Sequence, residues 1–406
     1  MTLVAPKRSR SPLTPSGRVV LANLGNLRLG DLRVVWCDGT EHDYHSGEPG
    51  PRGEIVIRDP AAARRMVLGG SIGFAEGYLD GTWTTPDLVA LLELLSANIV
   101  ARGRHHRSPL QPVQNLVHRL RLNTRRGARK NVAYHYDLGN DFYRLWLDPT
   151  MTYSCGLFEE GLPSAAAVPV AGLEQAQLAK WDRLLSLIAP LPGSSLLDVG
   201  CGWGGFAIHA AQAYDCRVTG ITLSEEQLAL ATERAREAGV ADRVRFRLQD
   251  YRDVRETFDH IASIEMFEAV GEAYWPLFFR QLRTCLRPGG RAGLQVITLD
   301  DDRFETYRTR ADFIQKYVFP GGMLPSPRAF ENEASAAGLV MGPPSFFAAS
   351  YATTLACWLD RFDAVRRPVA ALGFDDRFIR MWRYYLAYCI AGFRNGMIDV
   401  MQVALT

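Results

Sequence analysis

Apolar runs and amphipathic stretches alternate regularly along the second half of the chain. Five short apolar runs predict β-strands, at 194–200, 216–223, 244–250, 258–265 and 291–299. Apolar residues also recur at helical spacing and predict helices, at 175–190, 206–214, 224–239 and 274–290. Strands that alternate with helices in this way are typical of a doubly wound, mainly parallel sheet, so the predicted fold class is α/β.

The first hundred residues follow a different, mixed pattern. It predicts a hairpin, one further strand and two helices, at 32–45, 53–59, 60–69 and 86–100. The hairpin turns at Asp38-Gly39, a pair that favours tight turns. The stretch 70–83 is too rich in glycine for a helix or a strand, and we interpret it as a tight, buried turn whose aromatic residues belong to the core. A small α+β unit is therefore expected over 1–100.

Length and composition support a globular protein of two domains. The chain has 406 residues, 47% hydrophobic and 22% charged, which is too long for one ordinary core and too apolar for a disordered chain. No apolar run reaches the roughly 18 residues that span a bilayer. Residues 1–17 lack the apolar core of a signal peptide. Seven scattered cysteines indicate reduced thiols in the cytoplasm, and no cysteine or histidine spacing indicates a metal site.

The segment 102–130 contains nine Lys and Arg residues and no acidic residue. Apolar residues are interleaved at helical spacing, which gives a basic amphipathic segment. Such a segment suits an anionic membrane surface or a nucleic-acid backbone. The alternative is a solvated helix that links two domains.

A glycine-rich turn follows the first strand of the predicted sheet, with glycines at 200, 202, 204 and 205. Its spacing also fits a dinucleotide site. However, Asp198 lies inside the strand, where an acid would repel a pyrophosphate but would suit an ammonium and a sulfonium. The second strand ends with Thr222 and Ser224 rather than with the acid that binds a dinucleotide ribose. S-adenosylmethionine is therefore the better fit, and a turn without a ligand is the alternative.

Six motifs in register resemble one family. They are "YHYDLGNDFYRLWLDPTMTYSC", "LLDVGCGWGG", "VTGITLSEEQ", "MFEAVG", "FIQKYVFPGGMLPS" and "YATTLACWLDRF". Together they are similar to the cyclopropane-fatty-acyl-phospholipid synthases and their mycolic acid methyltransferase relatives. The resemblance implies a Rossmann-like class I methyltransferase domain over 131–406, a basic amphipathic linker over 101–130 and an accessory, lipid-docking domain over 1–100. It also implies a cytoplasmic, peripherally membrane-associated enzyme and a possible homodimer.

The resemblance implies methyl transfer from S-adenosylmethionine to the double bond of an unsaturated acyl chain in a phospholipid. Attack by the alkene leaves a carbocation, which aromatic faces can stabilise and which must be kept from water. A base then removes a proton from the new methyl group, and a cyclopropane ring closes. In the family this base is a bound bicarbonate, since a protein base beside a sulfonium would risk alkylation. The alternative product is a methyl- or methylene-branched chain without ring closure.

The motif match assigns the cofactor-binding residues by position. The Tyr153-Ser154 pair contacts the cofactor, and Asp198 lies beside its methionine and ribose region. The remaining assigned contacts, from the methionine side to the adenine side, are Gly200, Gly202, Thr222, Ser224, Gln227, Asp250 and Tyr251. Asp250 is expected to accept a hydrogen bond from the adenine amino group. Tyr136, Gly139 and Asn140 are expected near the site.

The bicarbonate contacts carried over from the family are Cys155 and Ile297 through their backbones, and Glu268 and Tyr351 through their side chains. Many relatives have histidine where this chain has Ala269 and Gln295. The amide of Gln295 can hold bicarbonate but cannot take a proton. As alternatives, Glu268 could cap a helix, Tyr351 could belong to the core, and Cys155 could be a nucleophile.

Three other functions share parts of this pattern. A small-molecule methyltransferase would work without lipid. A nucleic-acid methyltransferase would use the basic segment, but the chain has no segment like "NPPY", so no nucleic-acid partner is expected. A lipid carrier without catalysis would not bind S-adenosylmethionine.

Overall fold

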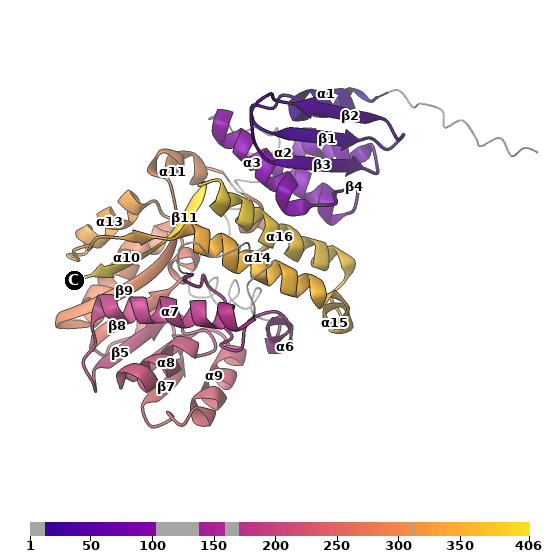
Figure 1. Ribbon diagram of the computed structural model, residues 1–406. Coiled ribbons are helices and arrows are strands. Elements are labelled where there is room, and N and C mark those ends of the chain that lie inside the picture. Colours follow the sequence, from indigo (N-terminus) through magenta and orange to yellow (C-terminus); the bar gives the residue numbers. More distant parts are fainter. Residues whose placement is uncertain (1–12, 103–137, 159–169, 311) are drawn as a thin grey trace, which may run out of the picture. The chain divides into compact units, whose positions relative to one another are not determined.

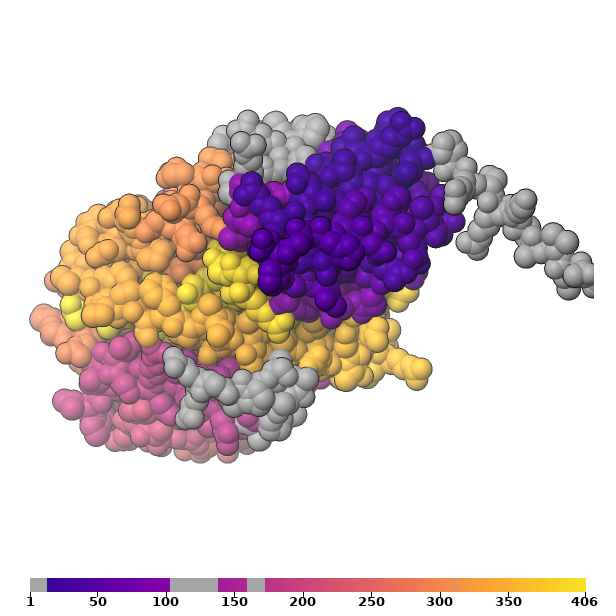
Figure 2. All heavy atoms as spheres, turned by 45° about the horizontal axis from the view of Figure 1, so that its top comes forward, coloured from indigo at the N-terminus to yellow at the C-terminus, as the bar shows by residue number. Residues whose placement is uncertain are grey.

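The computed structural model describes residues 13–102, 138–158, 170–310 and 312–406, which carry colour in Figures 1 and 2. The chain forms two compact units. The first is Met1–Gln114 with Asp375–Asn395, and the second is Asn115–Phe374 with Gly396–Thr406. Most of the basic segment 102–130 lies outside the described residues; only Arg102, the last residue of a helix, is described.

The first unit contains a four-stranded sheet in the order β2-β1-β3-β4. Its strands are β1 (Asp31–Val35), β2 (Glu41–His45), β3 (Arg52–Ile57) and β4 (Trp83–Thr84). The predicted hairpin is confirmed, since β1 pairs with β2 in antiparallel register. The helices of the first unit are α1 (Pro15–Leu24), α2 (Ala61–Leu79), α3 (Leu88–Arg102) and α16 (Asp376–Arg394).

The expected glycine-rich turn at 70–83 is wrong over most of its length. Helix α2 continues to Leu79 and is interrupted only at Gly70, whose backbone angles of φ 58° and ψ −136° are not helical. Gly73 and Gly77 are buried helical residues, and a Cβ at Gly77 would lie 2.7 Å from Trp83. These glycines therefore permit close packing within a helix instead of forming a turn.

Helix α16 groups with the first unit although the sequence-based division placed it in the methyltransferase domain. It packs against α2 and α3. The ring of Tyr384 lies 5.8 Å from that of Tyr78, and Arg394 donates to the Glu93 carboxylate at 2.5 Å. Most of the aromatic residues of α16 are buried.

The second unit is built on a seven-stranded sheet in the order β10-β11-β9-β8-β5-β6-β7. The central strands are β5 (Ser195–Val199), β6 (Arg217–Thr222), β7 (Val244–Leu248), β8 (Phe258–Ile264) and β9 (Leu286–Leu299). All five are parallel to their neighbours in this set, which confirms the five predicted strands and the α/β fold class. Strand β9 begins at Leu286, so the helix predicted over 274–290 is wrong for its last five residues. Strand β11 (Ile398–Leu405) adds to β9 in antiparallel register, and β10 (Ser345–Phe346) pairs with β11.

Helices cover both faces of this sheet (Figure 1). One apolar core lies beneath α7 (Val170–Ile188), α8 (Gly205–Tyr214) and α9 (Glu225–Glu237). The other lies beneath α10 (Trp275–Cys285) and α13 (Pro327–Ala336). The remaining helices are α6 (Asn140–Arg144), α11 (Asp301–Tyr307), α12 (Phe313–Tyr317), α14 (Ala348–Ala364) and α15 (Arg366–Ala371), with short 3-10 turns at Tyr251–Asp253, Phe267–Ala269 and Glu272–Tyr274.

The strand order creates one crevice at the carboxyl ends of the central strands. Strand β5 lies between β6 and β8, so the connections leaving β5 and β8 run to opposite sides. Ligands of open α/β sheets bind at such a switch point. No helix among the described residues is long and apolar enough to cross a membrane, and no group of three metal-binding side chains occurs among them.

Candidate functional site

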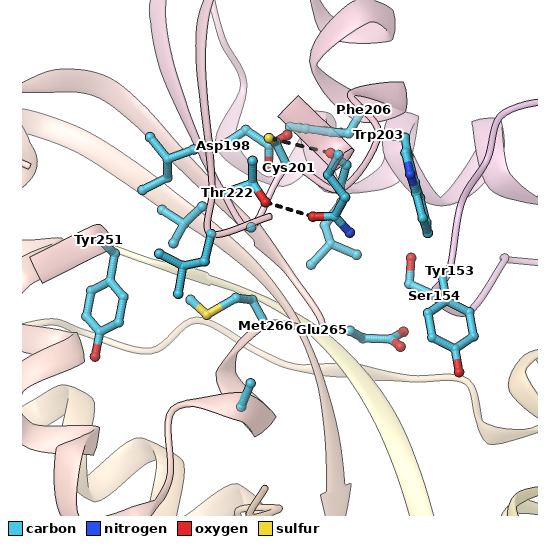
Figure 3. A pocket seen from close by; sticks show the side chains of 18 of the residues that line it. Tyr153, Ser154, Asp198, Cys201, Trp203, Phe206, Thr222, Tyr251, Glu265 and Met266 are labelled. Carbon is cyan, nitrogen blue, oxygen red and sulfur yellow. Dashed lines mark hydrogen bonds between the residues drawn. The ribbon is translucent and has the colours of Figure 1, made fainter. Parts of the chain in front are cut away.

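A cavity opens at the carboxyl ends of β5, β6, β7 and β8 (Figure 3). All but one of the residues assigned to the cofactor line it: Tyr153, Ser154, Asp198, Gly200, Gly202, Thr222, Gln227, Asp250 and Tyr251. The exception is Ser224, whose hydroxyl caps helix α9 by accepting from the Gln227 N–H at 3.3 Å. Ser224 therefore supports the wall of the cavity without lining it.

The glycine turn is held tightly against the next strand and against Met266. The N–H groups of Gly200 and Cys201 both donate to the Ile221 carbonyl at 3.0 Å. Gly200 has φ 84°, and a Cβ at this position would lie 2.7 Å from the Met266 side chain. Only glycine fits both the backbone angle and the space.

Asp198 is a buried carboxylate that faces the cavity. It is 2% exposed, and its Oδ2 has no hydrogen-bond partner among the described residues. Burial raises the pKa of Asp198 to about 7. A buried acid with an unused oxygen is costly unless a positive group neutralises it. The cavity therefore fits a ligand that carries positive charge, as the ammonium and sulfonium of S-adenosylmethionine do.

Polar contacts organise the two sides of the cavity that were assigned to the ribose and the adenine. The Thr222 hydroxyl donates to the Gln227 amide oxygen at 2.7 Å. The Asp250 carboxylate accepts from the Arg252 guanidinium, at 2.8 Å from Nε and 2.6 Å from Nη2. This pairing orients Asp250, so the amino group of an adenine would share a carboxylate oxygen of Asp250 with Arg252.

The segment around Tyr153-Ser154 forms the facing wall and is fixed from behind by helix α7. Gln177 donates to the Ser154 carbonyl at 3.0 Å, and the Lys180 ammonium donates to the Ser154 hydroxyl at 2.5 Å. Lys180 is completely buried, and burial lowers its pKa to about 8. A buried ammonium needs nearby negative charge.

Tyr153 belongs to a cluster of aromatic side chains. Its ring centroid lies 5.5 Å from those of Tyr143 and Trp146, and 5.3 Å from that of Trp358. Trp203, from the glycine turn, extends the cluster through Tyr143, at 5.0 Å. Tyr153 and Trp203 present aromatic faces to the cavity, and the other rings of the cluster pack against them.

The negative charge beside this wall comes from Glu265, which the sequence interpretation did not assign to the site. Three donors converge on its carboxylate: the Cys155 N–H at 2.9 Å, the Gln295 amide at 2.7 Å and the Tyr351 hydroxyl at 2.5 Å. Figure 3 shows this carboxylate pointing toward Tyr153 and Ser154 at the wall of the cavity. The motif match assigned two of these donor residues, Cys155 and Tyr351, to bicarbonate, and Gln295 stands where many relatives have histidine.

The other two assigned residues bond to each other. The Ile297 N–H donates to Glu268 Oε1 at 2.6 Å, while Glu268 Oε2 has no hydrogen-bond partner among the described residues. Burial raises the pKa of Glu268 to about 8, and the nearby charge of Glu265 adds to this rise. Glu268 follows β8 in a 3-10 turn and does not line the cavity.

The comparisons with known proteins agree with this geometry. A family model described as mycolic acid cyclopropane synthetase matches residues 123–403. The chain belongs to this family. It is an S-adenosylmethionine-dependent methyltransferase, as the sequence predicts.

Relatives match most of this methyltransferase. The chain is 41% identical over 382 residues to the tuberculostearic acid methyltransferase of Mycobacterium tuberculosis, covering 92% of this chain and 87% of that protein. It is 34% identical over 354 residues to the cyclopropane-fatty-acyl-phospholipid synthase of Escherichia coli, covering 87% of each. A crystal structure of a mycolic acid cyclopropane synthase complexed with SAH and CTAB matches with a TM-score of 0.61 and 34% identity, covering 68% of this chain and 97% of that one.

The other residues that the sequence interpretation discussed near the site differ in their locations and contacts. Asn140 accepts from the Trp203 indole N–H at 2.6 Å, which ties the glycine turn to helix α6. Gly139, at φ 87°, precedes that helix, and Ala269 lines the cavity. Tyr136 lies outside the described residues.

The sequence interpretation did not assign three residues of the site: Glu265, Lys180 and Gln402. Glu265 carried a usable signal, because it is an acid directly after an apolar strand at the sheet's switch point. Lys180 and Gln402 carried none, since each occupies an ordinary position in an amphipathic helix or a strand. Gln402 donates to the Gln295 amide oxygen at 2.9 Å and so orients the amide toward Glu265.

Cys155 acts through its backbone in this arrangement. Its thiol is buried and donates to the Gly156 carbonyl at 3.0 Å, and burial raises the pKa of the thiol well above its usual range. A nucleophilic thiol needs the opposite shift. The alternative of Cys155 as a nucleophile therefore has no support from the geometry.

We expect the variant Cys155→Ala to keep its activity within about tenfold of wild type, because the N–H donor remains and general acid–base groups are untouched. Its free energy of unfolding should fall by about 1 kcal/mol for the lost buried atom. Initial rates of methyl transfer, with chemical denaturation in parallel, measure both. A rate loss of about 1000-fold in a folded variant would instead indicate chemistry at the sulfur.

Proposed function

We propose that this methyltransferase transfers a methyl group to the double bond of an unsaturated acyl chain in a membrane phospholipid, and that ring closure gives a cyclopropane. The main support for the proposal is that three features lie next to one another in the site. A cavity that fits a cationic cofactor meets a wall of aromatic faces, and a carboxylate lies at that wall. The names of the relatives, which refer to fatty acyl and mycolic acid substrates, agree with it.

S-adenosylmethionine supplies an electrophilic methyl group on a sulfonium when it is bound. Asp198 would neutralise its positive charge, and Thr222 and Gln227 would face its ribose. Asp250 and Tyr251 would face its adenine. Tyr153 would separate this cavity from the acyl chain.

An isolated alkene is a weak nucleophile, so the site must act by position and environment. Close, fixed placement of the reacting atoms can supply much of the rate. The aromatic cluster around Tyr153 offers π-faces that attract positive charge on the acyl chain. The same cluster excludes water, which would otherwise trap a cationic carbon.

Bicarbonate, which the family resemblance implies, does not fit these residues. The Cys155 N–H, the Gln295 amide and the Tyr351 hydroxyl already donate to Glu265, and the Ile297 N–H already donates to Glu268. A second anion would lie against the Glu265 carboxylate without these donors. The proposed reaction therefore has no step that uses bicarbonate.

The test combines purified protein, S-adenosylmethionine and vesicles of a mono-unsaturated anionic phospholipid. Released fatty acids are examined by mass spectrometry and proton NMR. A gain of one CH2 with upfield ring protons supports the proposal. The same mass gain with an exocyclic methylene signal would keep the acyl substrate and replace the product. No mass gain, with bound cofactor, would overturn the acyl-lipid substrate.

We further propose that the basic segment 102–130 contacts an anionic membrane surface, and that the enzyme is peripheral and cytoplasmic. A homodimer stays a prediction. Activity on anionic vesicles should fall as salt rises from about 0.05 to 0.5 M, because the screening length shortens from above 10 Å to a few Å. Neutral vesicles are the control. Replacing Arg125, Arg126 and Arg129 with glutamine should reproduce the high-salt rate, whereas salt-insensitive activity on anionic vesicles would contradict the contact.

A further inference from the structure

Glu265 lines the cavity beside Tyr153 and Ser154, on the wall assigned to the cofactor. Its carboxylate is bound by one backbone N–H, one amide and one phenol hydroxyl, from three separate elements of the chain. We propose that Glu265 is the base of the reaction, and that its carboxylate replaces bicarbonate in this enzyme. The inference rests on the proposed methyl transfer to an acyl double bond and identifies the proton acceptor for it.

The shape and charge of a carboxylate match those of bicarbonate. Both are planar anions that present two oxygens to hydrogen-bond donors. Glu265 Oε1 accepts from Cys155 and Gln295, while Oε2 accepts from Tyr351. Three donors on one anion favour its charged form. The site is therefore complete without a small anion from solution.

The buried ammonium of Lys180 supplies the matching positive charge. It donates to Ser154, next to the Cys155 N–H that binds Glu265, and its charge favours the ionised form of the Glu265 carboxyl. Burial acts in the opposite direction and raises the pKa of Glu265 above its ordinary value. A carboxylate with a raised pKa is a stronger base than an exposed one.

The backbone of Glu265 is held in a conformation that a glutamate rarely adopts. Its φ is 51°, in the left-handed region, and its N–H donates to the Gln295 carbonyl at 2.8 Å. A glycine would adopt this angle without strain. Strained non-glycine residues cluster at functional sites, where the side chain must occupy one position.

The hydrogen bonds also protect the carboxylate from alkylation. Each of its oxygens already accepts at least one hydrogen bond. One donor is the amide of Gln295, which lies on strand β9, and another is the backbone N–H of Cys155. Such hydrogen bonds lower the nucleophilicity of the Glu265 carboxylate. They also prevent the side chain from turning into the position from which an oxygen could attack the sulfonium methyl group. Proton removal needs only approach of a C–H bond to one oxygen.

The step balances within the substrate and this side chain. The π electrons of the alkene form the bond to the methyl group, the sulfur keeps the electron pair of the broken S–C bond, and the second alkene carbon becomes cationic. A Glu265 oxygen then takes one proton from the new methyl group. The electron pair of that C–H bond forms the third bond of the ring, and the carboxylic acid later releases its proton to water.

The test compares wild type with Glu265→Gln and Glu265→Gly, in buffer freed of carbon dioxide and again with added bicarbonate. Glu331→Gln, on the exposed face of α13, is the matched control. We expect wild type and the control to be active and indifferent to bicarbonate. Glu265→Gln should lose about 100-fold or more in rate, without rescue, because the amide fills the site but takes no proton. Glu265→Gly should be inactive alone and regain activity with bicarbonate.

Binding of 13C-bicarbonate, followed by NMR, gives a readout that does not depend on catalysis. Wild type should not bind it at the site, while Glu265→Gly should. Wild type that binds bicarbonate, or that works only when bicarbonate is present, would overturn the inference, as would full activity of Glu265→Gln. Inactivity of wild type on every lipid under both conditions would overturn the proposed function instead, and the 13C titration would still decide whether Glu265 fills the anion position.

Discussion

Replacing Asp198 with asparagine should weaken the binding of S-adenosylmethionine by roughly 10- to 100-fold. Hydrogen bonds and charge pairs to ionised groups contribute about 1.5–3 kcal/mol, and each 1.4 kcal/mol is a factor of ten in affinity. Asparagine keeps the size of the side chain but removes the charge that the buried, unpartnered Oδ2 offers to the ligand. Isothermal titration calorimetry measures the change. Asp242→Asn, on an exposed position, is the control.

The same variant should make the ligand-free protein more stable at neutral pH. Because the pKa of Asp198 is raised to about 7, the folded protein binds a proton there that the unfolded chain releases near pH 4. This contribution to stability is therefore complete below about pH 4 and is lost as pH rises to about 7. Asp198→Asn should flatten that part of the stability curve, measured by denaturation from pH 4 to 8.

Cofactor affinity should rise with pH over the range in which stability falls, since the ionised form of Asp198 binds the cation. Affinity of wild type should increase as pH rises through about 7, and affinity of Asp198→Asn should not. A variant that binds like wild type, or that is less stable at pH 8, would contradict the role assigned to this carboxylate.

Replacing Gly200 with alanine should remove cofactor binding and destabilise the second unit. A Cβ would lie 2.7 and 2.9 Å from two atoms of Met266, so either the turn or Met266 must move. The left-handed backbone costs about 1–2 kcal/mol for a non-glycine residue, and overpacking adds about 1–3 kcal/mol.

The variant Gly193→Ala separates these two effects. Gly193 has a similar φ, 80°, but a Cβ there would have no atom within 4 Å. It should therefore lose only the backbone contribution and should bind S-adenosylmethionine like wild type. Calorimetric titration and chemical denaturation of both variants give the comparison. Equal losses in the two variants would show that contact with Met266 has no role.

The fold of the second unit could be predicted because its signals are local. Strand 194–200 is a short apolar run that ends at a glycine turn, and its neighbours repeat this pattern. The prediction for 70–83 was wrong because glycine counts carry no information about packing. Whether Gly77 forms a turn or lies in a helix depends on how closely Trp83 approaches it, which is a tertiary contact.

The candidate site could be predicted only where each residue acts on a ligand by itself. Asp198 stands out because an acid inside an apolar strand needs a partner. The environment of Glu265 arises from residues at 155, 295 and 351, which are distant in sequence and meet only after folding. The sequence showed the donors for an anion but not that the chain itself supplies the anion.

The most direct measurement uses S-adenosylmethionine that carries three deuterium atoms on its methyl group, with wild-type protein and mono-unsaturated phospholipid vesicles in buffer freed of bicarbonate. Mass spectrometry of the released acyl chains counts the deuterium transferred. We expect a product that retains two of the three deuteriums, because a protein carboxylate removes the third from the new methyl group. Retention of all three, or label found only outside the acyl chain, would contradict it.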